Sequence, residues 1–271
     1  MTKKFTWEDV SIGQFHQILA IMGMKKSELD KAIDVLSVLS GETSENYKNM
    51  PLEVVTDLLR KIEGLTAQNL KPRFIGGTYV VEGTTYLLTP CAEKMTAGQF
   101  IDYQLTLEKN PDDVALLCAV LLVPKGKKYG EGYDVMELRQ TLYDKFPYID
   151  SMGISFFAKE IRRVVRLYSL LFNQENEERT EEGKGSPEDT DPGEGDRRDK
   201  ESGRRDSAYV WDSVIRQIVQ AYNVDKYQVF EMSLVEFLND ATTCKREVLR
   251  HNKQVEEKIK QMRKGRKGRR R

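Results

Sequence analysis

Apolar and polar positions in the first part of the chain predict three amphipathic helices separated by short polar breaks. Ser11 and Gln14 have the spacing of a capping box at a helix start. A second pattern begins at Ser27 and stops at Gly41, which readily takes the left-handed conformation of a helix end. A third follows Pro51, which suits a first helical turn. The expected apolar faces are Phe15, Ile18, Leu19 and Met22 in the first helix, Leu29, Ile33, Leu36 and Leu39 in the second, and Val55, Leu58, Leu59 and Ile62 in the third.

The pattern changes between residues 73 and 89. β-Branched and aromatic residues dominate this segment, and glycines interrupt it. Residues 79–86, centred near Gly83, therefore predict a β-hairpin. Helical spacing resumes at Thr96, so the expected fold class is mainly α with a small β-hairpin.

The helix start at Thr96 repeats the one at Ser11. Both segments read [ST]xGQF, at an offset of 85 residues. A more apolar helix follows each copy, at residues 30–39 and 112–123, and a closing helix follows that, at residues 52–62 and 155–171. This order is typical of a duplicated helical unit joined by the hairpin. The alternative is that two capping boxes coincide by chance in a helix-rich chain.

Charge and apolar content divide the chain into four parts, although its total charge is zero. Residues 1–173 hold most of the large apolar side chains and predict a folded helical domain. Residues 174–207 have a net charge of −6 and no Val, Ile, Leu, Met, Phe, Tyr, Trp or Cys, which predicts a disordered acidic linker. Apolar residues return at helical spacing in residues 208–244, which predict a small helical module. Residues 245–271 are a basic tail of net charge +10, helical or disordered.

Neither a membrane span nor a cleaved leader is expected. The longest apolar run, residues 114–123, has about half the length that a bilayer requires. The first residues contain no apolar signal core. Cys91, Cys118 and Cys244 are odd in number and show no CxxC spacing, which fits buried thiols in a reducing compartment. The expected location is the cytosol.

The sequence contains few groups that are suited to catalysis. The only histidines, His16 and His251, have no metal-binding partner at a suitable spacing. Cys118 lies in the long apolar run, where burial would raise its pKa and make the thiol inert. We therefore expect no catalytic residue, no cofactor, no bound metal and no enzymatic activity.

The glycine- and lysine-rich loop at residues 125–134 has the residue types of a phosphate-binding loop. The GxxxxGK[ST] motif is absent, however, and Glu131 and Asp134 would repel a phosphate. A connector or a partner-contact loop is the favoured interpretation.

Large apolar side chains are too numerous in residues 208–244 for so small a module to bury them all alone. The surplus would dock on the first domain, on another copy or on a client protein; a compact mini-core is the alternative. The candidate partner-binding residues are Phe15, Phe100, Tyr129, Tyr133, Trp211, Tyr227, Phe230, Met232, Leu234 and Phe237.

A helix capped by Ser233 is expected to run into the basic tail. The tail can neutralise phosphates, which would give weak, salt-sensitive nucleic-acid binding. No aromatic residue interleaves its basic residues, so base stacking is not implied. An acidic partner and the chain's own acidic linker are equally suitable ligands. The candidate phosphate contacts are Lys258, Lys260, Arg263, Lys264, Arg266, Lys267, Arg269, Arg270 and Arg271.

Four stretches together resemble bacteriophage tail assembly chaperones of the two-part type with a C-terminal extension. They are residues 7–21 (WEDVSIGQFHQILAI), 95–102 (MTAGQFID), 121–134 (LLVPKGKKYGEGYD) and 230–239 (FEMSLVEFLN). The resemblance implies a non-enzymatic protein of the host cell cytoplasm that keeps the tape-measure protein soluble and recruits tail-tube subunits, with possible self-association. The alternative is a phage accessory or virion protein that binds nucleic acid non-specifically through the basic tail.

Overall fold

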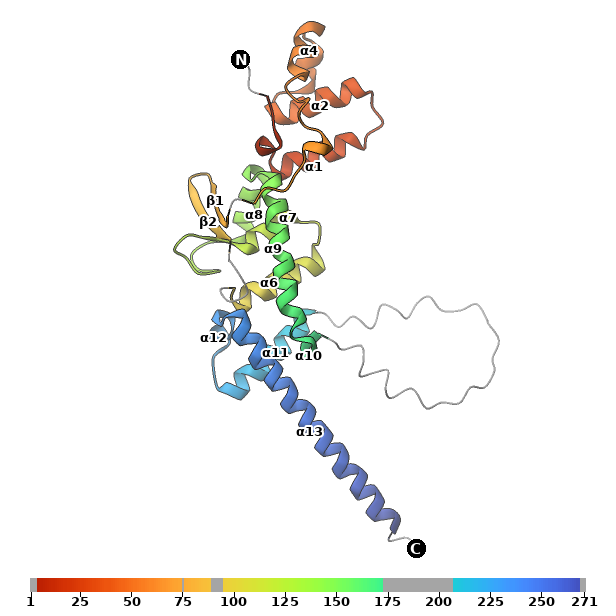
Figure 1. Ribbon diagram of the computed structural model, residues 1–271, viewed down its shortest axis with the longest axis vertical. Coiled ribbons are helices and arrows are strands. Elements are labelled where there is room, and N and C mark those ends of the chain that lie inside the picture. The colour runs from red at the N-terminus through yellow and green to blue at the C-terminus, as the bar shows by residue number, and fades with distance from the viewer. Residues whose placement is uncertain (1–3, 75, 89–94, 173–206, 269–271) are drawn as a thin grey trace, which may run out of the picture. The chain divides into compact units, whose positions relative to one another are not determined.

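The computed structural model describes residues 4–74, 76–88, 95–172 and 207–268, and these are mainly helical with a small three-stranded sheet (Figure 1). The predicted fold class is therefore confirmed. The chain divides into two compact units: unit 1 comprises residues 1–91 and 102–160, and unit 2 comprises residues 92–101 and 161–271. Apart from its last residue, the predicted acidic linker lies outside the described residues.

Unit 1 begins with short helices whose ends follow local sequence signals. The capping box is present, because Ser11 Oγ accepts from the Gln14 backbone N–H and Gln14 Oε1 accepts from the Ser11 N–H. Gly41 ends the second helix with a φ of 77°, in the left-handed region that was predicted. The elements are η1 (Trp7–Asp9), α1 (Ile12–Met22), α2 (Glu28–Ser40), α3 (Ser44–Lys48), α4 (Leu52–Leu59) and η2 (Ala67–Asn69).

The buried face of α1 differs from the predicted one. Phe15, Ile18 and Ile21 are buried, whereas Leu19 and Met22 are exposed. In α2, Leu29 is likewise exposed, although the rest of the predicted face is buried. Helix α1 carries apolar residues on more than one side, so its spacing alone does not select the side that packs on α2. Its core partners include Trp7, Val35, Leu39 and Ile149.

The predicted hairpin is confirmed as β1 (Thr78–Val81) and β2 (Thr84–Leu88). Glu82 and Gly83 at the turn both have positive φ, 48° and 79°, as a type I′ turn requires. One face of the hairpin is buried, and the Tyr79 ring meets the Phe146 ring edge-on at 5.4 Å.

A third strand, β3 (Leu122–Pro124), corrects the helix predicted for residues 112–123. Helix α7 (Val114–Leu121) ends early, and β3 pairs antiparallel with β2, with Leu87 opposite Val123. A short, fully apolar run fits a buried helix or a buried strand equally well, so pairing with β2 decided the outcome.

Four further helices lie wholly or partly in unit 1. They are α6 (Ala97–Lys109), α7, α8 (Val135–Lys145) and α9 (Tyr148–Arg166). Helix α8 packs against α7 and α1. Helix α9 begins at Tyr148, before the predicted start at residue 155. The boundary between the units falls within α6 and within α9.

Unit 2 contains α10 (Ser169–Phe172), α11 (Ser207–Tyr222), α12 (Lys226–Glu231) and α13 (Leu234–Gly268). The predicted cap is present, because Ser233 Oγ accepts from the Glu236 N–H at 3.3 Å. The Trp211 ring contacts the rings of Phe100 and Phe237, with centroids 5.5 and 6.0 Å away. Residues 95–101 therefore belong with these helices by contact, although they fall within the predicted domain of residues 1–173.

Each [ST]xGQF segment pairs with the elbow between two helices. In unit 1, the Ile12 N–H donates to the Phe146 carbonyl and the Tyr148 N–H donates to the Val10 carbonyl, at 3.0 and 2.9 Å. In unit 2, the Ala97 and Leu234 N–H groups donate to the carbonyls of Met232 and Met95, at 2.9 and 2.7 Å. The two segments thus make equivalent backbone contacts, each within its own unit.

Candidate functional site

The turn between α1 and α2 carries the apolar surface that we regard as the candidate site. Four large apolar side chains around this turn are each between 44% and 55% exposed: Leu19, Met22, Met24 and Leu29. We call this set the α1–α2 turn surface. Clustered exposed apolar groups mark interaction sites, and methionine adapts its shape to varied partners.

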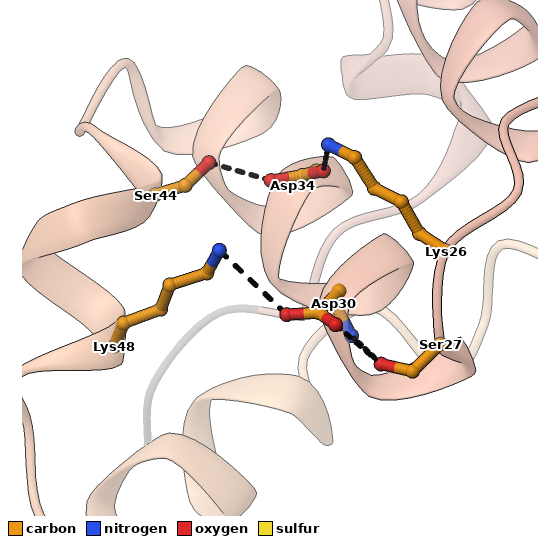
Figure 2. Close-up of polar contacts among 6 residues, drawn as sticks. All are labelled: Lys26, Ser27, Asp30, Asp34, Ser44 and Lys48. Atoms are coloured by element: carbon orange, nitrogen blue, oxygen red, sulfur yellow. Dashed lines mark hydrogen bonds and ion pairs between the residues drawn. The ribbon is translucent and has the colours of Figure 1, made fainter.

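A polar network anchors one side of this turn. Lys26, in the turn, donates from Nζ to the Asp34 carboxylate at 2.6 Å, and Ser44 Oγ donates to the other oxygen of that carboxylate at 2.7 Å (Figure 2). Asp34 belongs to the buried part of α2. The hydrogen bonds from Lys26 and Ser44 lower the pKa of Asp34 below its usual value, which keeps the carboxylate charged.

Asp30, one helical turn earlier, extends the same network. Ser27 Oγ donates to the Asp30 carboxylate at 2.5 Å, and the Lys48 Nζ lies 3.6 Å from it. The hydrogen bond from Ser27 lowers the pKa of Asp30. Figure 2 shows the two α2 carboxylates between the residues of α3 and those of the turn. The backbone that presents the apolar side chains is therefore tied to α2, and α2 is tied to α3.

Half of the predicted partner-binding residues lie in the core instead. Phe15, Phe100, Trp211, Leu234 and Phe237 are buried and offer no surface in this structure. Phe15 packs in the core of unit 1, where its ring stacks on that of Tyr148. In unit 2, residues 95–101 supply cover that the module of residues 208–244 lacks by itself. Of the alternatives for the surplus apolar side chains, the structure thus shows packing on this segment.

The other predicted partner-binding residues retain some surface. Tyr227 is 78% exposed on α12. Tyr129, Tyr133, Phe230 and Met232 are half-buried. Phe230 covers Gly98, where a Cβ atom would lie 3.4 Å from the Phe230 ring and carbonyl oxygen. Tyr227 is therefore the predicted residue of unit 2 that is best placed to meet a partner.

The loop of residues 125–134 is held by a contact to α6 and by a contact within the loop. Tyr129 donates from its hydroxyl to the Asp102 carboxylate at 2.8 Å, and burial raises the pKa of Tyr129. Lys127 Nζ donates to the Gly132 carbonyl oxygen. One of the lysines that a phosphate would need is thus engaged within the loop, which agrees with the connector interpretation.

The described parts of the chain were also compared with the expectations for metal ligands, thiols and clefts. No cluster of three or more His, Cys, Asp or Glu side chains there is arranged to hold a metal ion. Burial raises the pKa of Cys118, as predicted. A cleft of about 620 Å³ in unit 1 is lined in part by Trp7 and Arg73, but Arg73 is paired with Glu8 and Asp150.

Among the described helices, none is both long and apolar enough to span a bilayer.

Six of the nine predicted phosphate contacts lie in the last part of α13. Lys258 and Lys260 are exposed. The backbone of Arg263, Lys264, Arg266 and Lys267 is helical, whereas Arg269, Arg270 and Arg271 lie outside the described residues.

The α1–α2 turn surface was missed in the sequence, because Leu19, Met22 and Leu29 were assigned to buried faces. Methionines beside a turn, followed by Lys25 and Lys26, were the signal in the sequence that could have revealed this surface.

Protein-family models, curated proteins and solved structures were compared with the chain, and none of them matches it at a significant level.

Proposed function

We propose that the protein is a non-enzymatic bacteriophage tail assembly chaperone that keeps the tape-measure protein soluble and recruits tail-tube subunits. The observation that carries this proposal is the α1–α2 turn surface, which is apolar, methionine-rich and exposed. The identity of the clients comes from the sequence resemblance described above.

A surface of this kind suits a holding function. A long helical client exposes apolar faces that associate non-specifically until another apolar surface covers them. Flexible methionine side chains adapt to several such faces, and the anchored backbone lowers the ordering cost of binding. Binding of this type requires no catalytic group.

Co-expression with the tape-measure protein tests the proposal. Leu19→Ser with Met22→Ser removes apolar surface from exposed positions, so the fold should persist while the soluble fraction of the client falls severalfold. Gln17→Ser with Ala20→Ser alters two other exposed residues of α1 and should leave the solubility of the client unchanged. Equal client solubility with both double variants would refute the proposal.

Recruitment of tail-tube subunits is assigned to unit 2, where Tyr227 is the exposed aromatic residue of α12. Tyr227→Ala should weaken co-purification of the tube protein without changing the solubility of the tape-measure protein. Gln220→Ala, at an exposed position of α11 in the same unit, is the control.

The second candidate function is non-specific nucleic-acid binding, favoured by the exposed Lys258 and Lys260 on α13. It predicts that the chain retards DNA at low salt, with an affinity that falls steeply as salt rises. Deleting residues 258–271 should abolish the retardation. A chaperone function predicts that client solubility survives the same deletion.

A further inference from the structure

The second half of α13 presents a narrow apolar stripe with no cover among the described residues. Val248, Val255, Ile259 and Met262 are between 39% and 66% exposed. Together with Asn252, they follow one another at alternating intervals of four and three residues. We call these five positions the α13 stripe. Residues spaced alternately three and four positions apart form the seam of a two-stranded coiled coil, where they occupy the a and d positions.

Asn252 falls on an a position of this seam, between Val248 and Val255 at d positions. A buried Asn at a single a position costs stability but specifies register and favours two strands. A helix built to lie on a membrane has a wider apolar face with large aromatic or leucine side chains. The α13 stripe has the narrower form, which points to a single partner helix.

Charge selects among partner helices. Residues 245–262 carry six basic and three acidic side chains, and residues 263–271 add seven basic residues in the sequence. A second copy aligned in parallel would bring the same positive charge alongside. The chain's own acidic segment, residues 174–207, lacks the large apolar side chains that would fill the seam. An acidic amphipathic helix from another protein satisfies both requirements, because opposite charges steer association and select the partner.

We propose that the α13 stripe binds an acidic amphipathic helix of another protein as the second strand of a short coiled coil. This proposal goes beyond the chaperone function, because it rests on α13 alone and needs neither the tape-measure protein nor the tube protein. The stripe spans two heptads, or about 21 Å of helix. So short a seam implies weak, reversible binding that electrostatic attraction strengthens.

A synthetic acidic helix is the probe for the test. It is a labelled 28-residue peptide with Leu at the a and d positions, one Asn at a, and Glu at the e and g positions, titrated with the full chain by fluorescence anisotropy. Val255→Ser with Ile259→Ser should weaken binding about tenfold or more, since each substitution removes apolar area that the peptide would bury. Gln254→Ser with Gln261→Ser, exposed on another side of α13, should change it less than about twofold. Raising the salt concentration should weaken binding by the unaltered chain.

Several results would overturn the proposal. One is failure of the acidic peptide to bind, and another is equal binding by a peptide with Lys in place of Glu. Stripe-dependent dimerisation of the full chain in analytical ultracentrifugation would assign the stripe to a second copy. Stripe-dependent binding to phosphatidylglycerol vesicles, without peptide binding, would assign it to a membrane. Far-UV circular dichroism of the double variant checks that α13 remains helical, and the co-expression assay reports separately on the chaperone function.

Discussion

Thr96 and Ser233 form an antiparallel backbone bridge that fastens the start of α6 to the elbow between α12 and α13. Two residues further along α6, Gly98 lies under Phe230 at van der Waals distance. The bridge therefore brings together segments 137 residues apart in the sequence. It also brings Phe100 of α6 to Trp211, which is buried together with Phe237 rather than available to partners.

Ser11 and Pro147 form the corresponding bridge in unit 1, and Gly13 lies there against Tyr143. The equivalent contacts are those expected of a duplicated unit, which stays a hypothesis about the origin of the chain. In both copies the glycine admits an aromatic residue from the helix that precedes the elbow.

Gly13→Ala should destabilise the protein by about 1–3 kcal/mol, because a Cβ atom would lie 2.7 Å from the Tyr143 ring and 3.1 Å from its carbonyl oxygen. Gly23→Ala, at the end of the same helix, meets its nearest atom at 3.5 Å and should be neutral or slightly stabilising. Urea unfolding of the two variants measures the difference. Equal effects would show that Gly13 is not closely packed in solution.

Phe100 and Trp211 should show a coupling free energy of about 0.5–1.5 kcal/mol in a double-mutant cycle, since their rings meet edge-on. Phe100→Leu and Trp211→Leu, singly and together, provide the cycle by denaturant unfolding. Phe100→Leu combined with Val248→Ala, an exposed position of α13, should be additive within about 0.5 kcal/mol. Additivity in the first cycle would contradict the contact.

Arg73→Lys should lower the free energy of unfolding by about 2 kcal/mol, because lysine cannot make the two parallel bonds from Nε and Nη2 to Asp150 at 2.6 and 2.8 Å. The Asp150 side chain is buried, and its hydrogen bond raises the pKa of Arg73. Arg60→Lys, in the exposed pair with Asp57, should change stability by less than about 0.5 kcal/mol. Thermal and chemical unfolding of both variants checks the contrast.

Asp34 should make the free energy of unfolding vary with pH in the acid range. Its pKa is lowered in the fold, so its contribution is complete above the unfolded pKa of about 3.9 and is lost as pH falls through the folded pKa. Asp34→Asn should cost about 1–3 kcal/mol at pH 7 and flatten the stability profile below pH 4. Unfolding at pH 3 to 7 measures this, with Asp57→Asn as the exposed control. A profile unchanged by Asp34→Asn would show that the network does not form in solution.

The helix starts and the hairpin were predictable because their signals are local. Ser11, Ser27 and Ser233 cap helices through backbone groups within three residues. Gly41 and Gly83 take positive φ where a helix ends and where a hairpin turns. These interactions depend on neighbours in the sequence, so the sequence by itself determined them, together with the mainly helical fold class.

Tertiary structure decided which of several apolar sides of an element is buried. Helix α1 buries Ile21 and exposes Met22, strand β3 forms because β2 offers a free edge, and Trp211 reaches Phe100 from more than a hundred residues away. The physical reason is that burial depends on the area that distant segments cover. Residue spacing identifies the apolar sides of a segment, as it did for Leu36 and Leu39 of α2, but it does not show which apolar side a distant segment covers. The exposed α1–α2 turn surface follows from that same selection, so the candidate site became visible only in the folded chain.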